Sequence, residues 1–185
     1  TTVGIGVLVT VAAVAGLSNP EAIYPTAALR EFALANDVVT LAIGVPLLLS
    51  SMWLAGRGRL AGRLAWPGVV LYLLYGAVAY VVALPVTWVY PIHLVVAAGS
   101  VYTLVGLAVR VDATEIKKKL VGGIPGRWSA GVLIALGGFS LVRALAVLGG
   151  GIAVGSGLER TELAVLVADV LISPAWIIGG ALLWR

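Results

Sequence analysis

Apolar stretches of about 20 residues, the length that crosses a bilayer as an α-helix, recur along the whole chain. Buried helices of soluble proteins are rarely so long and so poor in charge. The 185 residues are 61% hydrophobic and 11% charged, which lies outside the composition of a soluble domain. The sequence therefore predicts an integral membrane protein with an all-α fold.

We expect a single domain, a polytopic bundle of six transmembrane helices. The predicted spans cover residues 1–17, 38–55, 65–84, 88–109, 128–148 and 162–184. Residues 26–36 form either a short interfacial helix or the first turns of the second span. Pro46 predicts a kink within that span, and the glycines at 149–157 predict a turn between the last two spans.

Basic residues set the expected orientation. They concentrate in two loops between spans, the first around Arg57, Arg59 and Arg63 and the second at 110–127. By the positive-inside rule both loops are cytoplasmic, and six spans place both termini on that side. We expect the cell membrane of a prokaryote, with the lipid bilayer as the environment. The basic residues give no reason to expect nucleic-acid binding, because membrane topology explains them.

Two of the predicted spans each carry one isolated charge. Arg143 lies about 10 Å below the outer end of the fifth span, and Asp169 lies about 12 Å into the sixth, at 1.5 Å of helix rise per residue. A short connection makes these spans antiparallel neighbours. Because an unpaired charge in a membrane is expensive, the sequence predicts an Arg143–Asp169 ion pair in the outer leaflet.

Further polar groups are expected at a similar depth. Asn36 and Asp37 lie at the outer mouth of the second span, and His93 lies in the fourth. A helical period places His93 on one face with other polar residues of its span. The predicted pocket-lining residues are Tyr90, Ser100 and Ser140. Each of these groups also has a purely structural interpretation. Asn36-Asp37 can be a helix start next to water, and His93 can be an interfacial hydrogen-bonding residue. The tyrosines of the third span can be packing residues or part of the aromatic belt at the membrane interface.

The ion pair has two interpretations. It can be purely structural and fix the register of two helices. Alternatively, it marks an outward-facing polar pocket, with Arg143 available to an anionic or carbonyl group and Asp169 or Asp37 able to carry a proton. The first function hypothesis is therefore a protein that binds or passes a small solute or protons, as a transporter does.

The rival hypothesis is an accessory or assembly subunit of a larger membrane complex, in which the ion pair is structural. The protein partners to expect are other membrane subunits or further copies of this chain in a homo-oligomer. Small residues suit close helix contacts in either case. They include Gly137, Gly138, Gly179 and Gly180.

Several chemistries are disfavoured. The chain has no cysteine, one histidine and one methionine, so thiolate metal sites and a bis-histidine haem are excluded. No predicted span contains the lysine of a retinal Schiff base, and no hydrolase motif is present. We expect no metal, no cofactor and no catalytic residues, and we favour a binding or transport protein over an enzyme.

The segment Asn36-Asp-Val-Val-Thr-Leu, the mid-span Pro46, the arginine-rich loop and the final span with Asp169 and Pro174 form a recognisable combination. It resembles a group of uncharacterised prokaryotic six-span membrane proteins whose second span opens with Asn-Asp. The resemblance implies the six-span architecture and implies that Asn36, Asp37 and Asp169 are recurrent polar positions. Arg143 departs from that pattern, and the resemblance implies no activity.

Overall fold

The structure, a computed structural model, describes residues 2–110, 126–154 and 157–184. Every regular element in these ranges is a helix, which confirms the predicted all-helical class. The elements are α1 (Thr2–Ser18), α2 (Pro20–Ile23), α3 (Ala27–Val39), the π-helical turn η1 (Thr40–Gly44), α4 (Val45–Gly56), α5 (Leu60–Ala83), α6 (Tyr90–Arg110), α8 (Gly126–Val154) and α9 (Arg160–Trp184). Most of the predicted second basic loop lies outside the described residues.

Five helical segments of the described chain are long and apolar enough to cross a membrane. They are Ala27–Gly56, Leu60–Ala83, Tyr90–Val109, Ala130–Ala153 and Arg160–Ala181. Helix α1 is apolar too, but it has only 17 residues. Of the six predicted spans, five therefore have the length of a membrane-crossing helix, and the first is shorter.

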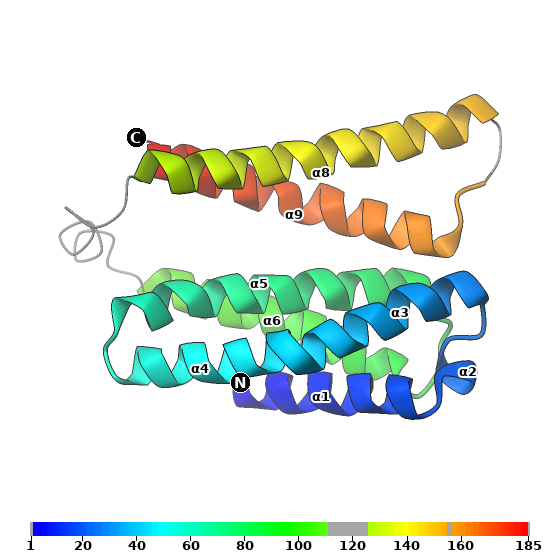
Figure 1. The fold of residues 1–185 in the computed structure, drawn as a ribbon, viewed down its shortest axis with the longest axis horizontal. Helices are drawn as coiled ribbons and strands as arrows, with labels where there is room; N and C mark the ends of the chain where they lie inside the picture. The colour runs from blue at the N-terminus through cyan, green and yellow to red at the C-terminus, as the bar shows by residue number, and fades with distance from the viewer. Residues whose placement is uncertain (1, 111–125, 155–156, 185) are drawn as a thin grey trace.

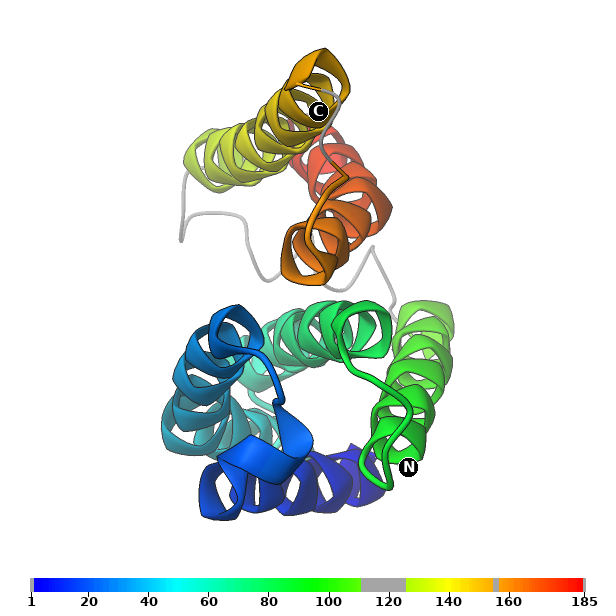
Figure 2. The same cartoon turned by 90° about the vertical axis from the view of Figure 1, so that its right-hand side faces the viewer.

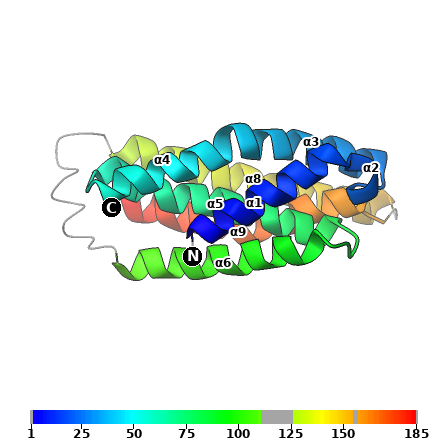
Figure 3. The same ribbon diagram turned by 90° about the horizontal axis from the view of Figure 1, so that it is seen from below.

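The helices form two groups that lie side by side (Figures 1 and 2). Helices α1, α3–α4, α5 and α6 surround a shared interior, and α1 crosses between α3–α4 and α6 (Figure 3). Helices α8 and α9 form an antiparallel hairpin, in which α9 packs on α5 whereas α8 packs mainly on α9. One end of the bundle carries loop 57–59 and the other carries α2 and loop 84–89. We call these the Arg57 end and the α2 end.

The helix that carries Asp37 begins at Ala27, so residues 26–36 are the first turns of a long span and not a separate interfacial helix. The hydroxyl of Thr26 caps it by accepting a hydrogen bond from the amide of Leu29 at 3.3 Å. At η1, directly before Pro46, the helix becomes π-helical. Proline lacks an N–H and its ring crowds the preceding turn, and the wider turn accommodates both effects without a break.

Helix α8 continues through Gly149, Gly150 and Gly151 and ends at Val154. The prediction of a turn that begins at Gly149 is therefore wrong. Glycine weakens a helix in water because its backbone is freely solvated and flexible. In an apolar environment the helical hydrogen bonds are the only partners that these peptide groups have, so the helix persists.

Two glycines bring the backbones of α8 and α9 into close contact. A Cβ atom on Gly137 would lie 2.9 Å from the carbonyl oxygen of Ser173, and one on Gly180 would lie 2.8 Å from that of Ala130. Small residues permit such packing between membrane helices. In contrast, nothing lies within 4 Å of a Cβ built on Gly138 or Gly179. Of these four glycines, Gly137 and Gly180 therefore face the contact between α8 and α9.

Candidate functional site

Two polar clusters lie in the half of the bundle nearest the α2 end, and α5 contributes a tyrosine to each. Tyr80 reaches Asp37 on α3, and Tyr75 reaches Asp169 on α9. Five residues turn an α-helix to a direction about 140° away, so the two phenols leave α5 on different sides. The Asp37 cluster comprises Tyr24, Asn36, Asp37, Tyr80 and His93. The Asp169 cluster comprises Tyr75, Arg143 and Asp169.

Asp37 is buried, with 3% of its surface exposed. Its Oδ2 accepts a hydrogen bond from the phenol of Tyr24 and its Oδ1 accepts one from the phenol of Tyr80, each at 2.6 Å. This length is typical of a hydroxyl bound to a carboxylate. The prediction that Asp37 can begin its helix next to water is wrong, because Asp37 lies near the end of α3 and faces the interior.

Helix α1 carries a glycine, Gly16, where it passes the hydrogen-bonded oxygens of Tyr24 and Asp37. A Cβ atom on Gly16 would overlap both the phenol oxygen of Tyr24 and Oδ2 of Asp37. Tyr24 itself lies in the short connection between α2 and α3, outside the long apolar helices, and its side chain is fully buried. Burial, followed by the nearby charge of Asp37, raises the pKa of the Tyr24 phenol, so Tyr24 acts as a neutral donor.

Tyr80 joins Asp37 to His93. The rings of Tyr80 and His93 stack with their centroids 4.3 Å apart, and the side-chain amide of Asn36 donates to the phenol oxygen of Tyr80 at 3.3 Å. Nε2 of His93 is buried and has no hydrogen-bond partner in the described part of the chain. The structure thus brings the predicted residues Asn36, Asp37 and His93 together.

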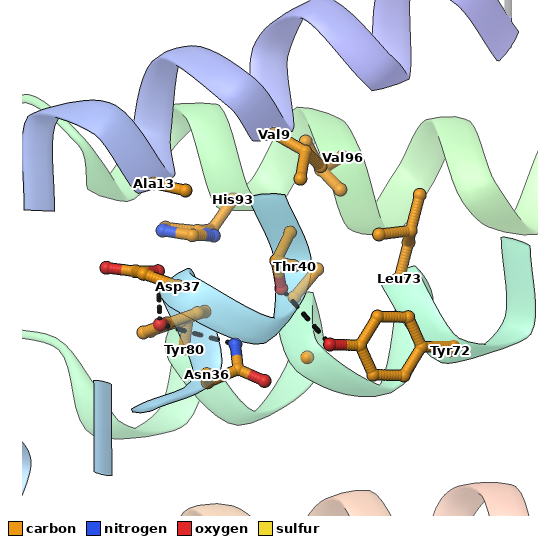
Figure 4. Close-up of a pocket in the computed structure, with 12 residues that line it drawn as sticks. Val9, Ala13, Asn36, Asp37, Thr40, Tyr72, Leu73, Tyr80, His93 and Val96 are labelled. Atoms are coloured by element: carbon orange, nitrogen blue, oxygen red, sulfur yellow. Dashed lines mark hydrogen bonds between the residues drawn. The ribbon is translucent and has the colours of Figure 1, made fainter. Parts of the chain in front are cut away.

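A small cavity lies among these side chains (Figure 4). Its volume is about 20 Å³, and it is bordered by Asn36, Asp37, Thr40, Tyr80 and His93, with apolar side chains completing its wall. One water molecule needs about 10–15 Å³ by this measure. The cavity therefore has room for a single water and is too small for an organic solute.

The predicted ion pair is present in the Asp169 cluster. Nη2 of Arg143 donates to Oδ2 of Asp169, and the phenol of Tyr75 donates to Oδ1 of the same carboxylate at 2.9 Å. The two partners differ in exposure: the Asp169 side chain is 3% exposed and that of Arg143 is 43% exposed. The carboxylate of Asp169 is therefore buried, whereas part of the Arg143 side chain remains accessible.

The accessible part of Arg143 faces a second pocket, with a volume of about 340 Å³. Ligand pockets start at about 300 Å³, so this one has the size of a small-molecule site. Helices α3, α8 and α9 enclose it, with Phe32 on one wall and Thr161 and Glu162 at the start of α9. The side chain of Glu162 also caps α9, because its Oε2 accepts a hydrogen bond from the amide of Glu159 at 3.1 Å.

The candidates separate into these two clusters instead of one shared pocket. Of the predicted lining residues, Ser100 is fully buried on α6, Tyr90 packs against the core at the α2 end, and Ser140 is half-buried on α8. None of these three borders either cavity. In the described ranges no group of three His, Asp or Glu side chains is placed to hold a metal ion.

The hydrogen bonds of the tyrosines were not predicted from the sequence. Tyr75 and Tyr80 were expected to be packing or belt residues, but each donates to a buried carboxylate. A usable signal existed for Tyr80, because it lies near the outer end of its predicted span, as Asp37 does. Tyr24 lies in a connecting segment, and no sequence period points it toward Asp37.

No protein-family model, curated protein or solved structure matches the chain. The geometry alone therefore defines its class. The described chain is an all-helical protein with apolar helices of membrane-spanning length, and it carries two buried carboxylates bound by tyrosines.

Proposed function

We propose that this chain is a six-span integral membrane protein of a prokaryotic cell membrane that binds a small solute in a pocket of its outer half. The arginines of loop 57–59 support a cytoplasmic Arg57 end, which makes the α2 end the outer one. Helix α9 ends at the Arg57 end (Figure 1), and the proposal assigns both termini to the cytoplasmic side. Helix α1 is the sixth span in this proposal, since a short helix is accommodated by local thinning of the bilayer. In this proposal the chain is also related to the uncharacterised prokaryotic six-span proteins that its Asn36-Asp37 segment resembles.

The observation that supports solute binding is Arg143, whose side chain is 43% exposed and borders the 340 Å³ pocket. A guanidinium has five N–H donors, and the ion pair occupies the terminal nitrogen Nη2. Asp169 and Tyr75 fix one side of the group, so its remaining donors are held in place before a ligand arrives. Such preorganisation increases affinity because little side-chain freedom is lost on binding.

The walls of the pocket define the class of solute. Arg143 suits a carboxylate, phosphate or carbonyl oxygen, and Phe32, Val147 and Leu166 suit an apolar body. Glu162 supplies an acceptor at the outer rim, so a solute that also carries an N–H or ammonium group fits better than a simple anion. We infer a small amphipathic carboxylate or phosphate compound with a donor group.

Purified protein in proteoliposomes provides the test. A panel of radiolabelled amino acids, short-chain carboxylates and phosphate esters is offered to the wild type, Arg143→Ala and Asp169→Ala. We expect saturable binding or uptake of at least one compound, reduced at least about tenfold in each variant, as loss of a charged hydrogen bond implies. Arg57→Gln removes a positive charge at the opposite end and is the matched control. Equal binding by wild type and both pocket variants contradicts the proposal.

A second candidate is an accessory subunit that packs against other membrane proteins. The observation that favours it is α8, whose apolar face includes Phe139, Val142 and Leu145 and which packs mainly on α9. Gly138 on the same helix has open space at its Cβ position, as a closely approaching partner helix requires. Purification in mild detergent followed by mass spectrometry tests it. A stoichiometric partner protein supports this candidate, and a lone monomer or homo-oligomer contradicts it.

A further inference from the structure

The imidazole of His93 and the carboxylate of Asp37 border the same water-sized cavity from two different helices. His93 is 6% exposed, and its Nε2 has no hydrogen-bond partner among the described residues. Figure 4 shows Asp37, Tyr80 and His93 at one end of this cavity, with Tyr72 at the other. A buried polar atom without a partner is unfavourable, so the site lacks one hydrogen-bonding group.

A single water in this cavity would supply that group. A buried water needs two to four polar partners, and the cavity offers Nε2 of His93, the carboxylate of Asp37 and the side chains of Asn36 and Thr40. The volume of about 20 Å³ admits one water and excludes a hydrated cation.

The hydrogen bonds of Tyr80 suit two protonation states of Asp37. The phenol oxygen of Tyr80 lies 2.6 Å from Oδ1 of Asp37 and 3.1 Å from the carbonyl oxygen of Ala33. A phenol has one proton to donate. While Asp37 is ionised, Tyr80 donates to it. Once Asp37 is protonated, Tyr80 donates to Ala33 and its oxygen accepts from the carboxylic acid. Both states are fully hydrogen-bonded without movement of a helix.

We propose that Asp37 and His93 form a proton-exchange site joined by one water molecule. In the forward step the N–H bond at Nε2 of the His93 imidazolium breaks and the water gains that proton. Another O–H bond of the same water breaks, and an O–H bond forms on Asp37. One proton moves, the water is regenerated, and no group is oxidised or reduced. The site does not depend on solute binding at Arg143.

The groups that face Asp37 support an exchangeable proton rather than a fixed ion pair. Helix α1 contributes Gly16 and has no charged residue. Tyr24 precedes α3, and α5 contributes Tyr80. Helix α6 contributes His93 to the cavity. Arg30 donates to the backbone carbonyl of Tyr24 and pairs with Glu21, so its guanidinium is engaged there and not by the carboxylate of Asp37.

Infrared difference spectroscopy of the reconstituted protein tests this site. The wild type is titrated from alkaline to acidic pH in sodium-free buffer, and the carbonyl stretch of a protonated carboxylic acid is recorded. We expect a band that appears on acidification, is lost in Asp37→Asn and remains in Asp169→Asn. His93→Phe keeps the ring stacked on Tyr80 and should shift the frequency of the band, because the acid loses its water-mediated neighbour.

Four results would overturn the proposal: no such band while the protein remains folded, a band that persists in Asp37→Asn, a band unaffected by His93→Phe, or a band suppressed by added sodium at fixed pH. The last result would assign a cation site. If Asp37→Asn does not fold, ¹³C labelling of aspartate in an Asp112→Asn/Asp169→Asn background decides, because Asp37 is then the one labelled aspartate of the sequence and the band must show the isotope shift. Loss of solute binding in Arg143→Ala with the band intact separates this site from the solute pocket.

Discussion

Gly16 lies so close to Asp37 that a single methyl group on its α-carbon would overlap the carboxylate oxygen Oδ2. The same methyl group would overlap the phenol oxygen of Tyr24. The hydrogen bond between Tyr24 and Asp37 therefore exists because α1 carries no side chain at this position.

Gly16→Ala should consequently destabilise the protein by about 1–3 kcal/mol, the usual cost of overpacking a buried site. Thermal unfolding in detergent, followed by tryptophan fluorescence, measures the loss. Gly4→Ala is the matched control on α1, because nothing lies within 4 Å of a Cβ at Gly4. Similar melting of the two variants would contradict the close contact.

Tyr80→Phe should cost more stability than Tyr72→Phe. Tyr80 donates to the buried carboxylate of Asp37, whereas the phenol of Tyr72 shares a 3.2 Å hydrogen bond with the neutral hydroxyl of Thr40. Loss of a hydrogen bond to a charged group costs about 1.5–3 kcal/mol, against about 1 kcal/mol for a neutral one. Unfolding of the two variants side by side provides the measurement, and the reverse order would count against an ionised Asp37.

Removal of Arg143 should be more harmful than removal of the charge on Asp169. Arg143→Gln leaves a carboxylate that is 3% exposed without its cation, and a broken buried pair of this kind costs about 3 kcal/mol. Asp169→Asn leaves an arginine whose side chain is 43% exposed, so solvent screens its charge more than that of a buried group. The double variant Arg143→Met/Asp169→Leu should recover stability relative to Arg143→Gln. If the double variant lost the sum of the stabilities lost by the single variants, the interaction between Arg143 and Asp169 would contribute no stability of its own.

Gly180→Val should separate α9 from α8. The first atom of a side chain at Gly180 would lie 2.8 Å from the backbone oxygen of Ala130, and a backbone atom cannot move aside as a side chain can. Crosslinking between cysteines introduced at the ends of the two helices measures the separation, since the native chain has no cysteine. Gly138→Val is the control, because its Cβ position is open and crosslinking should be unaffected.

Alkaline pH should weaken the fold partly through Tyr24. Burial raises the pKa of its phenol, so the folded protein holds the proton more tightly than the unfolded chain does. The stability that Tyr24 contributes is complete below the ordinary tyrosine pKa of about 10 and is lost as the pH rises above it. Tyr24→Phe should lose less stability than the wild type between neutral pH and pH of about 11. The exposed Tyr102 gives the control variant Tyr102→Phe.

The sequence was sufficient for the helical class and for the partner of Arg143. Both follow from local quantities: the lengths of apolar runs, and the depths of two charges on helices that a short turn makes neighbours. The partners of Asp37 were not predictable in this way. Tyr80 lies 43 positions away on a helix whose rotation about its own axis depends on packing against three others.

The failed prediction at Asp37 has the same cause. Asn-Asp before an apolar run is a common helix start. The sequence left open whether residues 26–36 were a separate interfacial helix or the first turns of the same span, and the helix begins at Ala27. The π-helical turn before Pro46 was foreseen only as a kink, because the sequence shows that the regular pattern is disturbed there but not which helix type results.

Helix α5 holds three phenols in fixed directions, to Thr40 through Tyr72, to Asp169 through Tyr75 and to Asp37 through Tyr80. A twist of α5 about its axis would break all three links at once. The ring of Phe32, which borders the Arg143 pocket, also packs edge-on against Tyr80 at 6.2 Å. A rotation of α5 would therefore disturb both carboxylates together, whereas a change confined to one side chain, such as the exchange of acceptors by Tyr80, leaves the other cluster in place.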